Sequence, residues 1–163
     1  MGTLRLVQEA KTIRDEENET RRSKGLPVFE QVWCVFDLDD NRLNYNNINF
    51  EKALQLANAE KMRVAYSNDA FELWYVLHFD YLQSQAHRSG YITMLEKPNL
   101  LNRKYSKMDG TMYDVLFTRQ NKAVENAKRL LAEHHPSHLP ASEKNPSTTV
   151  HELVLELNKY VRS

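Results

Sequence analysis

The chain has 163 residues, of which 41% are hydrophobic and 27% are charged. This length and composition allow one sizeable hydrophobic core and are too small for two comfortable domains. The 22 basic and 22 acidic residues leave no net charge, which excludes a strongly basic surface over the whole molecule, so a phosphate-binding patch must be local.

Two further features indicate the compartment. The single cysteine, Cys34, cannot form a disulfide within the chain and lies in an apolar run, where a thiol acts as a small hydrophobic side chain. No apolar stretch approaches the roughly 20 residues that span a bilayer, and no signal-peptide core follows Met1. We therefore expect a soluble protein of the reducing cytoplasm with no membrane partner.

The first half of the chain has the pattern of a helix followed by a βαβ unit. Apolar periodicity and the positions of glycine and proline predict, in order, a helix over 3–23, a strand from Val32, an asparagine-rich loop over 41–49, a helix over 50–60 and a strand over 62–66. A strand, helix and strand in this order imply parallel strands joined by a right-handed crossover.

The second half of the chain is predicted to be mainly helical. A strongly apolar helix begins at Asp69, and its apolar residues leave little room for a polar face, so it is expected to be buried on more than one side. The remaining pattern predicts a helix over 91–101, a long helix with Asp109 as its N-cap, a surface loop over 136–149 and a final helix over 150–161.

Three carboxylates, Asp37, Asp39 and Asp40, follow the first predicted strand directly. Because alternate side chains of a strand share a face, we expect Asp37 and Asp39 on one side of the sheet, at the carboxyl end where ligands bind in open α/β folds. Two oxygen donors placed in this way suit Mg²⁺, which one or two carboxylates hold together with water and substrate phosphate. The alternative interpretation is a polar loop that binds nothing.

A second polar group, Ser67, Asn68 and Glu72, follows the second predicted strand. In a parallel sheet this segment lies beside Asp37, so its side chains can face the same crevice. Glu72 has an equally good structural interpretation. With Asp69 it matches a capping box, in which the glutamate accepts a hydrogen bond from a backbone amide at the start of the helix.

Three further side chains are weaker candidates. His78 lies between apolar residues, a setting more typical of a hydrogen-bonded core histidine than of a ligand or a base. Lys104 and Lys107 flank Tyr105 in a predicted loop and can hold phosphates, although solvated loop charge is the commoner explanation. The four glycines form no phosphate-cradling loop, which excludes a nucleotide hydrolase of the P-loop type.

Three strings of the sequence, VWCVFDLDD, VAYSNDAFELWYVLHF and NPSTTVHELV, closely resemble the RloB-like family. They occur in the family's order, and the likeness extends from about Leu4 to the C-terminus. The resemblance implies a single domain with an α/β fold of the TOPRIM type. A small parallel sheet flanked by helices is expected over about residues 1–82, and a helical extension over about 91–163.

The resemblance also implies an activity, a metal-dependent nuclease acting on RNA or DNA in bacterial antiphage defence, with an ATPase as its partner. The implied cofactor is Mg²⁺ or Mn²⁺. The metal ligands are expected to be Asp37, Asp39 and Asp40, the catalytic residues Asp37, Asp39 and Glu72, and the substrate contacts Ser67, Asn68, His78, Lys104 and Lys107.

One feature of the family pattern is missing. A TOPRIM core of this kind opens with a strand that leads to a glycine and a glutamate, whereas this sequence starts at the helix that follows them. We therefore expect a metal site that lacks one carboxylate and a sheet with an exposed edge, to which a second copy of the chain can pair. The alternative function is a catalytically degenerate subunit that docks on the partner ATPase.

Overall fold

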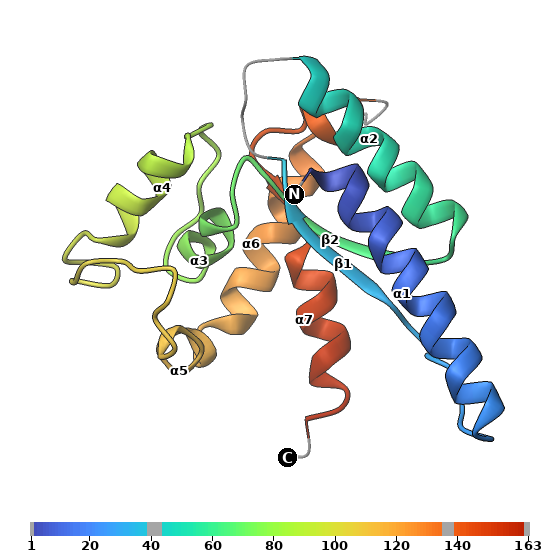
Figure 1. Cartoon of the computed structure of the whole chain (residues 1–163). Coiled ribbons are helices and arrows are strands. Elements are labelled where there is room, and N and C mark those ends of the chain that lie inside the picture. Colours follow the sequence, from blue (N-terminus) through green and yellow to red (C-terminus); the bar gives the residue numbers. More distant parts are fainter. Residues whose placement is uncertain (1, 39–43, 135–138, 162–163) are drawn as a thin grey trace.

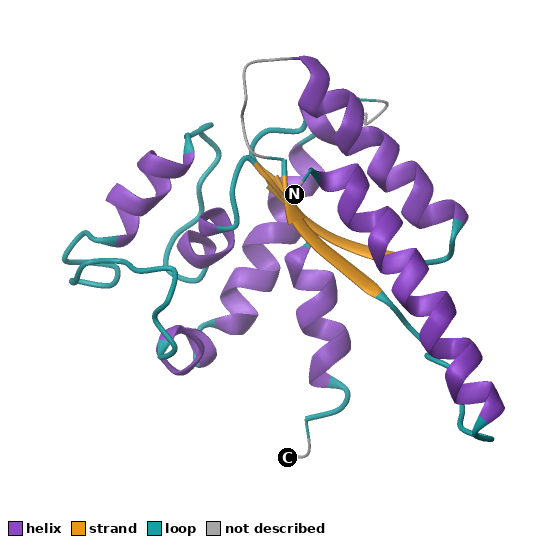
Figure 2. Cartoon of the chain, viewed as in Figure 1, coloured by secondary structure: helices purple, strands orange, loops and turns teal. Residues whose placement is uncertain are grey.

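The computed structural model describes residues 2–38, 44–134 and 139–161 (Figure 1). Helices make up most of the chain, and short strands lie at its centre (Figure 2). The elements are α1 (Thr3–Ser23), β1 (Trp33–Asp37), α2 (Asn44–Ala59), β2 (Arg63–Asn68), α3 (Glu72–Leu77), α4 (Arg88–Leu95), α5 (Met112–Phe117), α6 (Gln120–Glu133), the 3₁₀ helix η1 (Ala141–Glu143), β3 (Ser147–Thr148) and α7 (Val150–Asn158). This arrangement confirms the predicted α/β class, with a helical second half.

The strands form one mixed sheet in the order β1-β2-β3. β1 and β2 are parallel, as the βαβ pattern predicts, and their register places Asp37 beside Ser67. β3 pairs antiparallel with the other side of β2, where Ser67 lies opposite Thr148. The carboxyl ends of the two parallel strands therefore lie next to each other, and β1 is an edge strand of the sheet that the described residues form.

Helices cover both faces of the sheet. α1 and α2 lie on one side of β1 and β2, while α3, α6 and α7 lie on the other (Figure 1). Because side chains alternate along a strand, Cys34 and Phe36 of β1 are buried against α1 and α2. Ala65 of β2 belongs to the second core cluster, together with residues of α3, α6 and α7. The sheet thus separates two hydrophobic cores.

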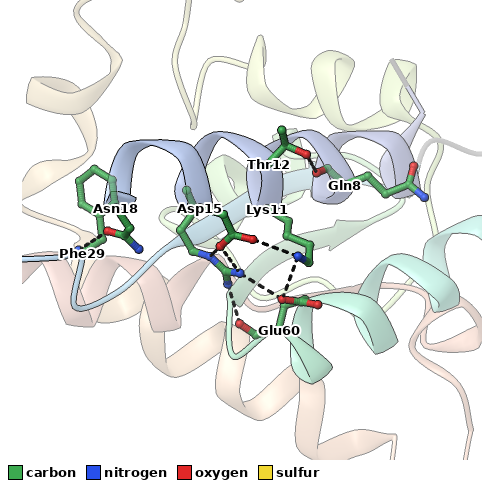
Figure 3. Close-up of polar contacts among 8 residues, drawn as sticks. Gln8, Lys11, Thr12, Asp15, Asn18, Phe29 and Glu60 are labelled. Atoms are coloured by element: carbon green, nitrogen blue, oxygen red, sulfur yellow. Dashed lines mark hydrogen bonds and ion pairs between the residues drawn. The ribbon is translucent and has the colours of Figure 1, made fainter. Parts of the chain in front are cut away.

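Ion pairs fasten α1 to the turn that follows α2. The ammonium of Lys11 lies 2.9 Å from the Asp15 carboxylate, one turn along α1, and 3.7 Å from the Glu60 carboxylate (Figure 3). The guanidinium of Arg14 lies 3.0 Å from the Glu60 carboxylate and also donates to the Glu60 carbonyl oxygen at 2.7 Å. These contacts hold the first helix of the chain beside the crossover helix.

The predicted loop over 41–49 is wrong at its end, because α2 begins at Asn44 and includes the segment up to Asn49. Phe50 and Ala53 are fully buried against the sheet, and this packing anchors the helix. Once those residues are helical, the cost of nucleation is already met, and each residue added before them forms a backbone hydrogen bond that offsets its own loss of entropy, so the helix extends into the asparagine-rich segment.

The segment 136–149 was predicted to be a surface loop, and its described part contains η1 and β3 instead. Ser147 and Thr148 are fully buried. Burial of the Thr148 hydroxyl is possible because it donates to the Tyr66 carbonyl oxygen at 3.0 Å and lies 2.9 Å from the Ser67 hydroxyl. The strand depends on partners from β2 and has no apolar pattern of its own.

Two predicted helices end or break where their sequence patterns continue. The apolar helix expected from Asp69 covers only α3, and a tighter turn follows, in which the His78 amide donates to the Tyr75 carbonyl at 3.2 Å. The long helix expected after Asp109 is divided into α5 and α6 at Arg119, whose φ of −106° is not helical. Apolar periodicity continues across both breaks, so it does not reveal them.

Phe50 offers a test of how α2 packs on the sheet. Its ring lies 5.7 Å from that of Phe36 and 5.3 Å from that of Tyr66, in edge-to-face contacts. We expect Phe50→Ala to lower the free energy of unfolding by about 3–5 kcal/mol, because it leaves a cavity between α2 and the sheet. Ile48→Ala, on the same helix at a side chain that is 51% exposed, is expected to change it by less than about 0.5 kcal/mol. Urea titration measures both, and equal losses would contradict this packing.

Candidate functional site

The candidate site lies where the two parallel strands end. Asp37 is the last residue of β1, and the backbone amide of Leu38 donates to the Ser67 carbonyl oxygen at 3.0 Å, so the chains leave the sheet side by side. The Asp37 side chain is 18% exposed, as a carboxylate that meets a ligand requires. Asp39 and Asp40, the other two predicted metal ligands, lie outside the described residues.

Arg88 joins Asp37 to Glu72. Its Nη2 atom lies 2.7 Å from Asp37 Oδ2, and its Nε atom lies 3.4 Å from Glu72 Oε2. Asp37 comes from the end of β1, Glu72 from the first turn of α3 and Arg88 from the start of α4. Two carboxylates from separate segments therefore flank a single cation at the carboxyl end of the sheet.

The other oxygen of Glu72 faces two further donors. The Tyr105 hydroxyl donates to Glu72 Oε1 at 3.3 Å, and the Lys107 ammonium lies 3.8 Å from the same atom. Burial and the negative charge of Glu72 raise the pKa of Tyr105 well above its ordinary range, so this hydroxyl keeps its proton and remains a donor. The Glu72 side chain is only 2% exposed, and these three partners make its burial possible.

These contacts decide between the two interpretations of Glu72. α3 begins at Glu72 itself, and the residue before it, Phe71, makes no side-chain capping bond. The Glu72 carboxylate accepts from Arg88 and Tyr105 instead of the backbone amides of its own helix. The capping-box interpretation is therefore wrong, and the glutamate faces the crevice beside Asp37.

Ser67 and Asn68, two predicted substrate contacts, are fully buried and bonded within the fold. The Ser67 hydroxyl lies 2.9 Å from that of Thr148, and the Asn68 amide donates to the carbonyl oxygens of Ala141 and Ser142 at 3.2 and 3.0 Å. These bonds hold η1 and β3 against the end of β2. Both side chains thus connect the end of β2 to β3 and η1. Their contact with substrate stays a prediction.

His78 and Lys104 lie apart from the two carboxylates. His78 is 3% exposed, and its Nδ1 atom lies 2.8 Å from the Trp74 carbonyl oxygen. A carbonyl only accepts, so Nδ1 carries the proton, and burial lowers the pKa of the ring, which keeps it neutral. The Lys104 ammonium is exposed and pairs with Glu96 at 3.0 Å. Of the two predicted lysines, only Lys107 contacts the candidate site.

Arg88 is the functional residue that sequence reasoning missed. It lies in the polar break before a helix, without a motif around it. The available signal was indirect, because a buried glutamate beside a strand-end aspartate requires a cation, and Arg88 is among the few basic side chains in the segment that follows α3.

The carboxylate pair fits a hard divalent cation in its chemistry. Asp37 and Glu72 supply oxygen donors, and the Arg88 guanidinium between them shows that a positive charge is stable at this position. Mg²⁺ is commonly held by one or two carboxylates, with water and substrate phosphate as its other ligands. The described residues include no group of three or more His, Cys, Asp or Glu side chains arranged around one point, so the pair alone does not form a closed metal cage.

In a comparison with protein families, the model described as "RloB-like protein" matches residues 2–157. The chain therefore belongs to the RloB-like family. Comparison with curated proteins and comparison with solved structures return no match. Within the described ranges, no helix has both the length and the apolar character needed to cross a membrane.

The ion pairs of Arg88 give a stability prediction. Arg88→Gln leaves the buried Glu72 carboxylate without its guanidinium partner, and we expect the free energy of unfolding to fall by about 2–4 kcal/mol. Arg5→Gln breaks the exposed pair between Arg5 and Glu9 and is expected to change it very little. Urea unfolding at neutral pH measures both, and an unchanged stability of Arg88→Gln would show that Glu72 does not depend on this partner.

The buried histidines give a pH prediction. Burial lowers the pKa of His78 and His151 below the ordinary value of 6.5, so just below that pH the unfolded chain binds more protons than the folded chain. Stability is therefore fully present above about pH 6.5 and is lost as the pH falls, by up to about 1.4 kcal/mol per pH unit for each histidine. His78→Gln should reduce this slope between about pH 7 and 5.5, whereas His87→Gln, at an exposed imidazole, should not. Equal slopes in the parent and His78→Gln would contradict the assignment.

Proposed function

We propose that this RloB-like chain is a metal-dependent phosphodiesterase that cleaves RNA or DNA in bacterial antiphage defence. The single observation that supports the proposal most strongly is the convergence of Asp37 and Glu72 on one cation at the carboxyl end of the parallel strands. The family resemblance supplies the reaction class. The two carboxylates come from the two segments that the family pattern associates with catalysis.

The proposed cofactor is Mg²⁺ or Mn²⁺, which Asp37 and Glu72 would hold together with Asp39 and Asp40. When bound, it would supply positive charge for the scissile phosphate and polarisation of the attacking water. Tyr105 keeps Glu72 in place by donating to Oε1. Lys107, whose side chain is 60% exposed, adds positive charge at the rim, where a phosphate would approach.

Arg88 has two parts in this proposal. Without substrate it pairs with both Asp37 and Glu72. Its side chain is 28% exposed, so it reaches solvent and can turn toward a bound phosphate, which a guanidinium binds through two parallel hydrogen bonds. The Arg88 guanidinium would then stabilise the carboxylates of Asp37 and Glu72 before substrate binds, and the phosphate of the substrate afterwards.

The proposal predicts that Asp37→Asn and Glu72→Gln each lower cleavage of nucleic acid by at least about 100-fold, because each loses a charged oxygen ligand. The assay follows end-labelled RNA and DNA strands with the full chain and Mg²⁺ or Mn²⁺. Asp114→Asn, an exposed carboxylate on α5, is the matched control and should cleave like the parent. Unchanged activity of Asp37→Asn would refute the proposal.

A second candidate is a non-catalytic subunit that docks on a partner ATPase. The observation that favours it is that Arg88 already pairs with both carboxylates, as in a purely structural ion-pair network. It predicts that the full chain forms a stable complex with the ATPase, and that Asp37→Asn leaves the defence activity of that complex unchanged. Loss of defence activity in a complex that still assembles would favour the nuclease.

A further inference from the structure

A cavity of about 580 Å³ lies beside the candidate site, between α3, α5 and α7. Its volume is in the range of cavities that hold small molecules and cofactors. Six aromatic residues line it, including Trp74 and Tyr75 of α3, Tyr113 and Phe117 of α5, and Tyr160 beyond α7. Trp74, Phe71 and Tyr75 belong to the core or pack against it. Tyr113, Phe117 and Tyr160 are more than half exposed, and neither core packing nor the proposed cleavage chemistry accounts for these three rings.

The rings are arranged as surfaces for stacking. Tyr113 and Phe117 lie one turn apart on α5, with their ring centroids 5.5 Å apart, and both are more than half exposed. Trp74 is 5% exposed, and its ring centroid lies 4.8 Å from that of His78 in a T-shaped contact. A flat, π-rich group that entered between α5 and α3 would cover exposed ring faces on one side and the buried indole on the other.

Polar atoms line the same cavity. Because His78 donates through Nδ1 to the Trp74 carbonyl oxygen, its Nε2 atom carries no proton and is an acceptor. Gln120 and Asn158 pair with each other, the Asn158 amide donating to Gln120 Oε1 at 2.7 Å. This pairing leaves the Gln120 amide hydrogens and the Asn158 carbonyl oxygen to serve a ligand. The cavity thus offers donors and acceptors beside aromatic faces.

Aromatic contacts connect the cavity with the carboxylates. The ring of Tyr75, which lines the cavity, lies 6.1 Å from that of Tyr105, whose hydroxyl donates to Glu72. Lys107 lies beside Glu72, and the guanidinium of Arg119 lies 5.0 Å from the ring of Phe79, the residue after the cavity-lining His78. Cations therefore lie near the candidate catalytic site and near the cavity.

We propose that the cavity binds an unpaired nucleobase of a single-stranded substrate. Stacking on aromatic side chains with cations along the backbone is how proteins hold single strands, and the donors and acceptors beside the rings suit the edge of a base. A base within a duplex has both faces stacked and its edge paired, so it cannot enter. This inference rests on the proposed function, and it specifies the substrate as one with a base free to leave the stack.

The chain contains two tryptophans, which makes a direct test possible. In a Trp33→Phe background, the fluorescence of Trp74 reports on the cavity alone. Without divalent metal, we expect a short single strand to quench this fluorescence. A strand of the same length with abasic sites, and a duplex of the same sequence, should bind at least about tenfold more weakly. Equal quenching by the intact and abasic strands would overturn the proposal.

Two variants localise the effect. Tyr113→Ala and Phe117→Ala remove exposed rings of the cavity, so they should fold normally and weaken binding of the intact strand by about tenfold. Phe29→Ala removes a similarly exposed ring that does not line the cavity and should bind like the parent. Parent-like binding by both cavity variants would overturn the proposal, as would quenching by an apolar helical peptide and not by the strand.

The assay separates this inference from the proposed cleavage. Quenching is measured without metal, whereas cleavage needs Mg²⁺ or Mn²⁺. Base-dependent quenching without cleavage would reject only the nuclease, and metal-dependent cleavage without base-dependent quenching would reject only the nucleobase cavity.

Discussion

Burial of the Glu72 carboxylate is the constraint on which the candidate site depends. A charge removed from water in this way is stable only beside opposite charge and hydrogen-bond donors, and Arg88, Tyr105 and Lys107 supply them from segments far along the chain. The requirement therefore organises the irregular region after α3. It brings the start of α4 to the sheet and keeps the segment around Tyr105 against α3.

The short parallel sheet gives this arrangement its position. Because β1 and β2 are in register at Asp37 and Ser67, the segments that leave them lie side by side, and the buried hydroxyl and amide of Ser67 and Asn68 secure β3 and η1 behind them. The polar residues at the strand ends thus divide into two groups. One group holds the sheet together, and the other faces the crevice, where Arg88 pairs with both carboxylates.

The sequence predicts the parts of this account that depend on local periodicity. The βαβ pattern correctly places Asp37 beside the segment that contains Glu72, because parallel strands bring their carboxyl ends together. Arg88 could not be found in this way, since its role depends on the return of an irregular segment to the sheet. Ser147 and Thr148 were missed for a similar reason, because the Thr148 hydroxyl is buried through partners in β2, and a two-residue strand has no period to detect.

The central claim is that Asp37 and Glu72 form one cation site. Titration of Mn²⁺ into the full chain, with the heat of binding measured by calorimetry, tests it most directly. The account predicts that Mn²⁺ binds and that Asp37→Asn and Glu72→Gln each weaken binding by at least about tenfold, while Asp114→Asn binds like the parent. Mn²⁺ binding of the same strength in the parent and in Glu72→Gln would contradict it.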